Sequence, residues 1–154
     1  MGLSITKRIE WDAGHRLLKH GGKCQNLHGH RYAADITIVP SSHAGTKRDH
    51  KGVDEVGVVL DFSTAKRVVG GWVDDKWDHG YVAQEGDPFG TLADELGMKV
   101  YWMRNAPSAE NLAEELYHAT KVLLEPHFVR ISRIELFETP TCSAVWEPDL
   151  SKRP

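Results

Sequence analysis

The chain has 154 residues, a formal net charge of −3 and a sequence pI near 6.3. This length allows one domain with a substantial core, and the slightly acidic balance argues against a general nucleic-acid-binding surface. No signal-peptide pattern opens the chain and no apolar run is long enough to cross a bilayer, so we expect a cytoplasmic protein without membrane contact. The two cysteines, Cys24 and Cys142, make no disulfide framework, so Cys24 is expected as a thiol available for chemistry.

The chain opens with a predicted β-hairpin. Residues 4–17 and 28–39 alternate apolar and polar side chains, and a loop with paired glycines separates them, as expected for two antiparallel strands. One parity of the first strand carries Ile5, Ile9, Trp11, Ala13 and, at its end, His15. The hairpin would therefore bring His15 beside the start of the second strand.

Two further histidines open the second strand. His28 and His30 are two apart in the run CQNLHGH, so on a strand they share a face, about 6.6 Å apart along the chain. The same parity continues through apolar residues, and unpartnered imidazoles on a buried face are costly. Three histidines from two strands, counting His15, predict a catalytic zinc site with one open position. Two alternatives stay open here: a structural zinc with Cys24 as fourth ligand, and hydrogen-bonded histidines without a metal.

A polar segment and a short strand follow the hairpin. Residues 40–55 are mostly polar and read as a mobile loop, which places His43 and His50 in solvent. Residues 56–62 are mainly apolar and are predicted as a short strand ending at Asp61, where the carboxylate caps or turns the chain.

The first main helix is predicted from Ser63, as its N-cap, to about Lys76. Its inner face is expected to consist of Val68, Val69, Trp72 and Val73. Asp78 and His79 follow the helix directly. Adjacent residues of a strand point to opposite faces, so both can face one site only if they lie in a turn. The alternative is an exposed turn without a role in chemistry.

A short helix and a second main helix come next. Asp87 is the predicted cap of the short helix and Gly97 its stop, and the strand KVYWM follows. The second main helix begins after Ser108 and ends at Pro126. Its inner face is expected to repeat Leu112, Leu116, Thr120 and Leu123.

Two strands close the chain, over residues 131–138 and 143–146. Glu138 shares a parity with Ile134 and Leu136, so it is expected to face inward, where a carboxylate can accept paired hydrogen bonds; the alternative is a surface glutamate at a strand end. Leaving aside two short strands in the middle, the order is ββααββ. It predicts an α+β fold with a four-stranded antiparallel sheet and two main helices on one face.

The motifs DAGHRL, CQNLHGHRY, VVLDF, WDHG, PSAENLA and FETPT, in this order, resemble the 6-pyruvoyltetrahydropterin synthase / 6-carboxytetrahydropterin synthase family of the tunnelling fold. They cover most of the chain, so residues 1–154 are expected as a single domain of this kind. The resemblance implies a homohexamer of two stacked trimers. It also implies a zinc held by His15, His28 and His30, proton transfer by Cys24, Asp78 and His79, and a pterin ring anchored by Glu138.

Three residues separate Cys24 from the HGH run, a spacing similar to that of the 6-carboxytetrahydropterin synthases of the queuosine pathway. This branch implies a zinc-dependent conversion of 7,8-dihydroneopterin triphosphate to 6-carboxy-5,6,7,8-tetrahydropterin, with release of acetaldehyde and triphosphate. Two alternatives are a 6-pyruvoyltetrahydropterin synthase, which only eliminates triphosphate, and a non-catalytic zinc-stabilised binding domain. The segments at residues 40–55 and 81–106 are longer than in compact bacterial members of the family.

Overall fold

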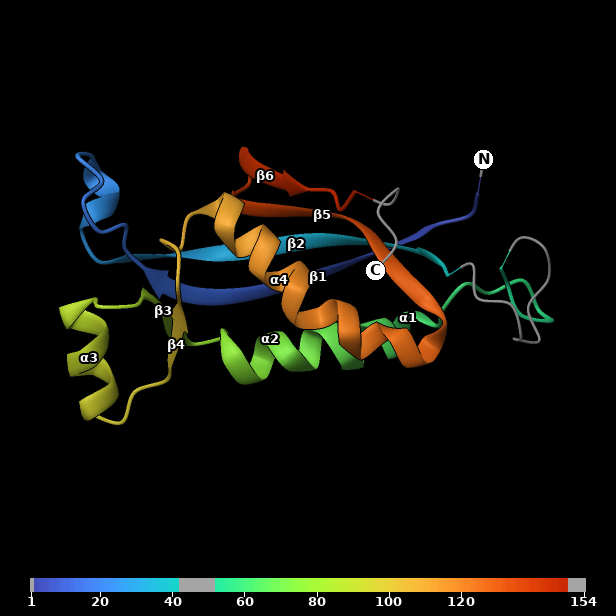
Figure 1. Cartoon of the computed structure of the whole chain (residues 1–154), viewed down its shortest axis with the longest axis horizontal. Helices are drawn as coiled ribbons and strands as arrows, with labels where there is room; N and C mark the ends of the chain where they lie inside the picture. The colour runs from blue at the N-terminus through green and yellow to red at the C-terminus, as the bar shows by residue number, and fades with distance from the viewer. Residues whose placement is uncertain (1, 42–51, 150–154) are drawn as a thin grey trace.

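The computed structural model describes residues 2–41 and 52–149 (Figure 1), and these form a sheet of strand order β4-β3-β1-β2-β5-β6. The strands are β1 Ile5–His15, β2 His28–Pro40, β3 Gly80–Gln84, β4 Val100–Met103, β5 Val129–Thr139 and β6 Cys142–Trp146. The longer helices are α1 Phe62–Ala65, continued by the π-helical turn η2 Lys66–Gly70 and by α2 Gly71–Lys76, then α3 Pro88–Glu95 and α4 Ala109–Leu124. Two short 3₁₀ turns are η1 Lys23–Gln25 and η3 Glu125–His127.

The predicted hairpin is confirmed. β1 pairs antiparallel with β2 along the whole length of β1, from Ile5 opposite Ile38 to His15 opposite His28. The side chains of one parity, including Trp11 and those of the three histidines, face the helices, because alternate residues of a strand point to opposite sides of the sheet.

The other parity of the hairpin forms an outer face dominated by charge. The Arg8 guanidinium donates two hydrogen bonds to the Asp35 carboxylate, at 2.7 and 2.8 Å, and Arg31 donates one to Asp12 at 2.6 Å. Charged pairs of this kind keep the outer face polar, while the inner face forms the core. The sheet is therefore a clear boundary between two chemically different sides.

The first main helix begins two residues earlier than predicted. The Asp61 carboxylate, not the Ser63 hydroxyl, caps it by accepting the Ser63 backbone N–H at 2.7 Å. An aspartate is at least as good an N-cap as a serine, so the earlier acid starts the helix. The predicted inner face is confirmed: Val69 and Val73 are buried, and Val68 and Trp72 pack against the core.

The predicted strand over residues 56–62 is wrong. These residues form a turn that Asp54 stabilises. Its carboxylate accepts hydrogen bonds from the backbone N–H groups of Val56 and Val58, at 3.0 and 2.8 Å, and Gly57 has φ of +86°. Aspartate side chains compete with strand pairing in this way and produce turns. An apolar run alone did not reveal that competition.

A strand absent from the prediction, β3, joins the sheet next to β1. It runs parallel to β1 and to β4, so the sheet is mixed rather than antiparallel. Tyr81, Val82 and Ala83 are all buried, because the core covers one side of β3 and α3 the other. A strand buried on both faces lacks the alternation by which strands are recognised in sequence. The α+β class is confirmed, and the four-stranded antiparallel sheet is wrong.

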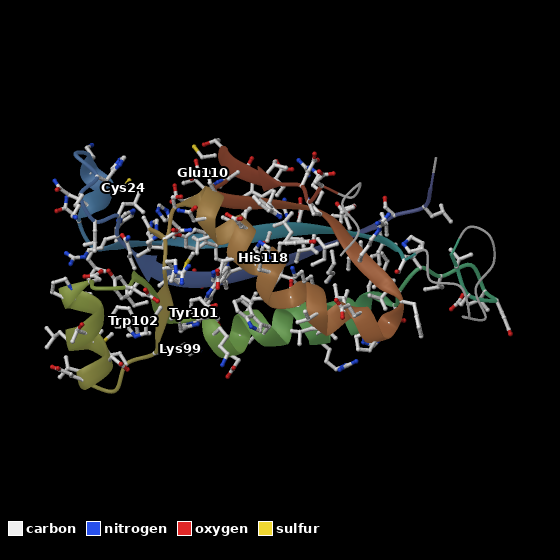
Figure 2. The ribbon with its side chains drawn as sticks, viewed as in Figure 1. Cys24, Lys99, Tyr101, Trp102, Glu110 and His118 are labelled. Atoms are coloured by element: carbon white, nitrogen blue, oxygen red, sulfur yellow. The ribbon has the colours of Figure 1, made fainter. Side chains whose placement is uncertain are left out.

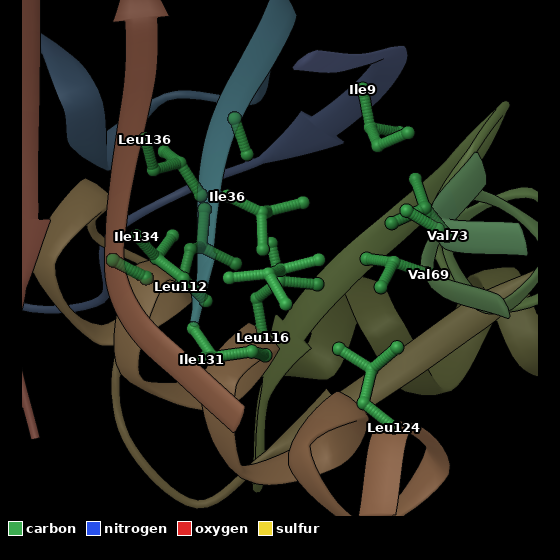
Figure 3. Packing of buried hydrophobic residues seen from close by; sticks show 14 of the residues in the cluster. Ile9, Ile36, Val69, Val73, Leu112, Leu116, Leu124, Ile131, Ile134 and Leu136 are labelled. Atoms are coloured by element: carbon green, nitrogen blue, oxygen red, sulfur yellow. The ribbon is translucent and has the colours of Figure 1, made fainter. Parts of the chain in front are cut away.

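The core lies between the sheet and the two main helices (Figure 3). Ser108 caps α4, and Leu112, Leu116 and Thr120 are buried as predicted. Leu123 is wrong: it is 40% exposed, while Leu124 is fully buried. The buried positions of α4 keep a spacing of four residues through its last turn, so the face continues at Leu124 and not at Leu123.

The short helix α3 is confirmed with its cap at Asp87, and Gly97 ends the segment with φ of +75°. In Figure 1, α3 lies apart from the other helices, next to β3 and β4. Most of the predicted loop over residues 40–55, including His43 and His50, lies outside the described residues. Among the helices of the described part, none is long and apolar enough to span a membrane.

Candidate metal centre and active site

Three imidazoles converge at one end of the β1–β2 hairpin. His15 ends β1, His28 begins β2 directly opposite, and His30 lies two residues further along on the same face. One ring nitrogen from each histidine lies within 4.8 Å of the other two. The structure thus brings together the three residues that the sequence predicted as metal ligands.

Two of the imidazoles are oriented by backbone carbonyls. The Nδ1 of His15 lies 2.7 Å from the carbonyl oxygen of Pro107, just before α4, and the Nδ1 of His28 lies 2.8 Å from that of Asn26. A carbonyl only accepts, so both Nδ1 atoms carry the proton. The Nε2 atoms of neutral His15 and His28 are then unprotonated and turned toward the centre, as in metal-ligating histidines.

The contact between these two nitrogens is the strongest sign of a cation site. His15 Nε2 and His28 Nε2 are 3.1 Å apart, yet neither carries a proton for the other. Zinc binds imidazole nitrogens at about 2.0–2.1 Å in tetrahedral sites, which separates two of them by about 3.3 Å. His30 Nε2 is buried and has no hydrogen-bond partner within the described residues. The residues present therefore fit a zinc ion.

The protonation state suits metal binding. Burial lowers the pKa of His15, although its hydrogen bond to Pro107 acts in the opposite direction, and burial also lowers the pKa of His30. Both imidazoles are therefore neutral near pH 7, which is the form that binds metals.

Glu138 lies beside the triad, on β5. Its Oε1 is 3.5 Å from His15 Nε2 and 3.7 Å from His30 Nε2, and its side chain is 25% exposed. The predicted inward orientation of Glu138 is confirmed. The carboxylate is thus close to the imidazoles of His15 and His30 in its own chain.

Cys24 lies in η1, on the loop that joins β1 to β2 (Figure 2), and is partly buried. Its carbonyl accepts a hydrogen bond from the backbone N–H of Leu17 at 2.8 Å, which closes the loop. Its thiol does not join the cluster of ligand atoms formed by the histidines. A closed site of three imidazoles and one thiolate is therefore not what this arrangement favours.

Asp78 and His79 form a second cluster, in the turn that precedes β3. His79 has φ of +55°, and its Nδ1 lies 2.8 Å from the Asp78 carboxylate. Several bonds fix this turn: Asp12 donates its N–H to Asp78 at 3.0 Å, and the Lys99 ammonium donates to the Asp78 carbonyl at 2.7 Å. The turn that both residues need in order to face one site is present.

The two clusters lie on opposite faces of the sheet. Asp12, whose carboxylate lies within 4.8 Å of the ligand atoms of Asp78 and His79, alternates along β1 with inward-facing Ala13 and His15. His79, whose side chain is 79% exposed, borders an open cavity of about 470 Å³ that is also lined by Asp12 and His30. Within one chain, Asp78 and His79 therefore do not join the ligand atoms of the histidine triad, although His79 and His30 border the same cavity.

Asp87 is a buried charged residue near the site that the sequence predicted only as a helix cap. Its carboxylate is fully buried and accepts hydrogen bonds from the Arg16 guanidinium, at 3.0 and 3.1 Å, and from the Tyr81 hydroxyl at 2.7 Å. This network ties α3 to the residue that follows His15. No local signal in the sequence pairs residues 71 positions apart.

Comparison with known proteins decides the family. A family model described as 6-pyruvoyl tetrahydropterin synthase matches residues 4–149. The chain belongs to this family. Two relatives, both named 6-carboxy-5,6,7,8-tetrahydropterin synthase, support the assignment. The Rickettsia bellii protein is 41% identical over 143 residues, 91% of this chain and 96% of the relative. The Haemophilus influenzae protein is 31% identical over 142 residues, 89% of this chain and 93% of the relative.

Solved structures agree with this fold. An uncharacterised protein from Wolinella succinogenes superposes with a TM-score of 0.75 at 20% identity, over 96% of this chain and 98% of that chain. The Caenorhabditis elegans 6-pyruvoyl tetrahydropterin synthase superposes with a TM-score of 0.66 at 20% identity, over 96% of both chains. Members of the 6-pyruvoyl tetrahydropterin synthase family thus share this chain's arrangement of sheet and helices.

Proposed function

We propose that this chain is a zinc-dependent 6-carboxytetrahydropterin synthase of queuosine precursor biosynthesis. Its reaction converts 7,8-dihydroneopterin triphosphate to 6-carboxy-5,6,7,8-tetrahydropterin and releases acetaldehyde and triphosphate. The observation that carries the proposal is the histidine triad, in which the Nε2 atoms of His15 and His28 face each other without protons, in a chain whose relatives bear this name. We also propose that residues 1–154 form one domain of this type.

The proposed reaction needs a Lewis acid, supplied by the metal, and a base, supplied by the Cys24 thiolate. His15, His28 and His30 would hold the zinc, which supplies Lewis acidity for a substrate oxygen and so acidifies the adjacent C–H group. Cys24 is the proposed base for that C–H group, because its loop connects the two strands, β1 and β2, that bear the ligands. A cation nearby favours the thiolate form of a cysteine, which is the form that accepts a proton.

Asp78 and His79 are the proposed proton-transfer partners of Cys24, and they would come from a neighbouring chain. Burial acts to raise the pKa of Asp78, but the N–H of Asp12 and the His79 imidazole outweigh this and lower the pKa. The ionised carboxylate holds the proton on His79 Nδ1, which leaves Nε2 to take or give a proton. Their place on the face opposite the triad supports a site assembled from two chains.

Glu138 is the proposed anchor of the pterin ring. A carboxylate can accept paired hydrogen bonds from the ring N–H and amino groups of a pterin. Its distance of 3.5 Å from His15 Nε2 supports an anchor that acts in the site of its own chain. We propose a homohexamer of two stacked trimers as the assembly that brings neighbouring chains to each site.

Product analysis tests the proposed reaction. The zinc-loaded protein is incubated with 7,8-dihydroneopterin triphosphate, and the products are identified by mass. Formation of 6-carboxytetrahydropterin together with acetaldehyde supports the proposal. Formation of 6-pyruvoyltetrahydropterin would assign the chain to the pyruvoyl branch, and an unchanged substrate would favour a non-catalytic zinc domain.

A further inference from the structure

Tyr32 carries a buried hydroxyl without a hydrogen-bond partner among the described residues. The residue lies on β2, two positions after His30, and its side chain is 1% exposed. Its hydroxyl has no hydrogen-bond partner in the described part of the chain. A buried hydroxyl without a partner is costly, because it has given up its bonds to water. Such a cost is tolerated most readily where a ligand completes the bond.

The tyrosine ring is a wall of the histidine site. Its centroid lies 5.5 Å from the His30 ring and 5.8 Å from the His15 ring, with interplanar angles of 73° and 83°. Trp11 stacks on Tyr32 at 5.5 Å and 14°, so the ring is held in place from the side of the core. The hydroxyl is therefore pre-positioned, and little ordering would be needed when a ligand binds.

The hydroxyl of Tyr32 is a donor at any physiological pH. A phenol has an ordinary pKa of about 10, which lies well above physiological pH. The phenol therefore stays neutral and keeps its proton. The proposed pterin anchor Glu138 lies 3.5 Å from His15 Nε2, and the His15 ring contacts the Tyr32 ring, so the anchor and the tyrosine border the same site.

We propose that the Tyr32 hydroxyl binds substrate by donating a hydrogen bond to an oxygen of the pterin's side chain. This inference rests on the proposed function, because it takes the pterin triphosphate as the ligand. The alternative is a structural role, in which the hydroxyl is bonded inside the protein and supports the fold. Removal of the Tyr32 hydroxyl oxygen distinguishes the two roles. A substrate-binding role predicts weaker substrate binding without loss of stability, and a structural role predicts loss of stability with substrate affinity unchanged.

The test uses Tyr32→Phe in a Cys24→Ala background, which binds substrate without turning it over. Both the background and the double variant are loaded with zinc and titrated with 7,8-dihydroneopterin triphosphate by calorimetry. We expect binding about tenfold weaker in the double variant, a loss of about 1.4 kcal/mol. We expect its zinc content to equal that of the background. The metal-free Tyr32→Phe chain should unfold at a temperature no lower than the unmodified chain.

Tyr101→Phe is the matched control, since its hydroxyl already donates to Glu115 at 2.6 Å. It should lower the unfolding temperature and leave substrate affinity unchanged. If Tyr32→Phe leaves affinity unchanged and lowers stability, Tyr32 is structural and the inference is overturned. If the Cys24→Ala background binds no substrate at all, the proposed function itself fails and the inference falls with it.

Discussion

At the scale of single residues, the site depends on which nitrogen of each histidine carries the proton. The carbonyls of Pro107 and Asn26 hold the protons of His15 and His28 on Nδ1. Each Nε2 is then a lone pair directed at the same point. Two lone pairs that face each other repel without a cation and bind one when it is present. The hydrogen bonds that orient the imidazoles therefore also give the site its affinity for a metal.

Removal of a ligand should therefore release the metal. We expect His28→Ala and His30→Ala to lose zinc affinity by more than the roughly 10–100-fold that loss of an outer-shell partner costs. Metal analysis after dialysis measures this, with His118→Ala on α4 as the control that keeps its zinc. Full occupancy in both ligand variants would rule out the triad as the zinc site.

The thiol is predicted to behave differently from the imidazoles. Cys24 lies outside the cluster of ligand atoms, so Cys24→Ala should retain one zinc per chain and lose turnover. The exposed Cys142 provides the control, since Cys142→Ala should change neither quantity. Zinc content and turnover are measured on the same preparations. A parallel loss of zinc and activity in Cys24→Ala would instead make this residue a ligand.

The triad could be predicted from sequence because strand parity alone puts the three histidines on one buried face. The partners that orient them could not, since the Pro107 carbonyl lies 92 residues from His15. The orientation of His79 could not be predicted from the sequence either. It depends on where β3 joins the sheet, and β3 shows no alternation by which it could have been recognised.

At the scale of elements, α3 is fastened to the end of β1 by one buried carboxylate. Burial alone would raise the pKa of Asp87, but the hydrogen bonds from Arg16 and Tyr81 outweigh it, and the pKa is lowered. A carboxylate with a lowered pKa stabilises the folded state above the pKa of the unfolded chain, about 3.9, and that stabilisation is lost as the pH falls.

Asp87→Asn tests this attachment. At pH 7 we expect a loss of about 2 kcal/mol in the free energy of unfolding, because hydrogen bonds to a charged group are replaced by weaker ones. The difference from the unmodified chain should shrink as the pH falls below about 3.9, because the unfolded chain then binds a proton that folded Asp87 takes up only at a lower pH. Urea unfolding at pH 7 and pH 3 measures both effects.

Asp75→Asn is the control for Asp87→Asn. Asp75 is exposed and pairs with Lys76 on the surface, so its loss should not measurably change stability. If Asp87→Asn lowered the free energy of unfolding by the same amount at both pH values, the charge of Asp87 would not be what attaches α3.

The elements that could be predicted are those whose signals are local. Capping at Asp87 and Ser108 and the alternation of the hairpin were sufficient for α3, α4, β1 and β2. The turn at Asp54 forms because its carboxylate competes with strand pairing for backbone N–H groups. β3 is buried because the core covers one side of it and α3 the other. Both are properties of the folded chain and not of the local sequence. The sheet was consequently predicted as four antiparallel strands, although it is mixed and larger.

At the scale of the whole molecule, the sheet has two edges, β4 and β6, in the part of the chain that the structure describes. Edge strands present backbone groups that can pair with another chain. We expect these edges to support the proposed homohexamer, and light scattering of the zinc-loaded protein measures its mass. A fully active monomer would overturn the assembly.

The central claim is that one site combines the triad and Cys24 of one chain with Asp78 and His79 of another. Equal amounts of inactive Cys24→Ala and His79→Ala chains are dissociated, mixed and reassembled, and their activity is compared with each variant treated alone. Random assembly in a closed oligomer should restore about a quarter of the unmodified activity, since that fraction of sites receives both intact residues. No recovery of activity, in hexamers shown by mass to contain both variants, would contradict the claim. If each site were built from a single chain, every site would contain one defective residue and mixing could not restore activity.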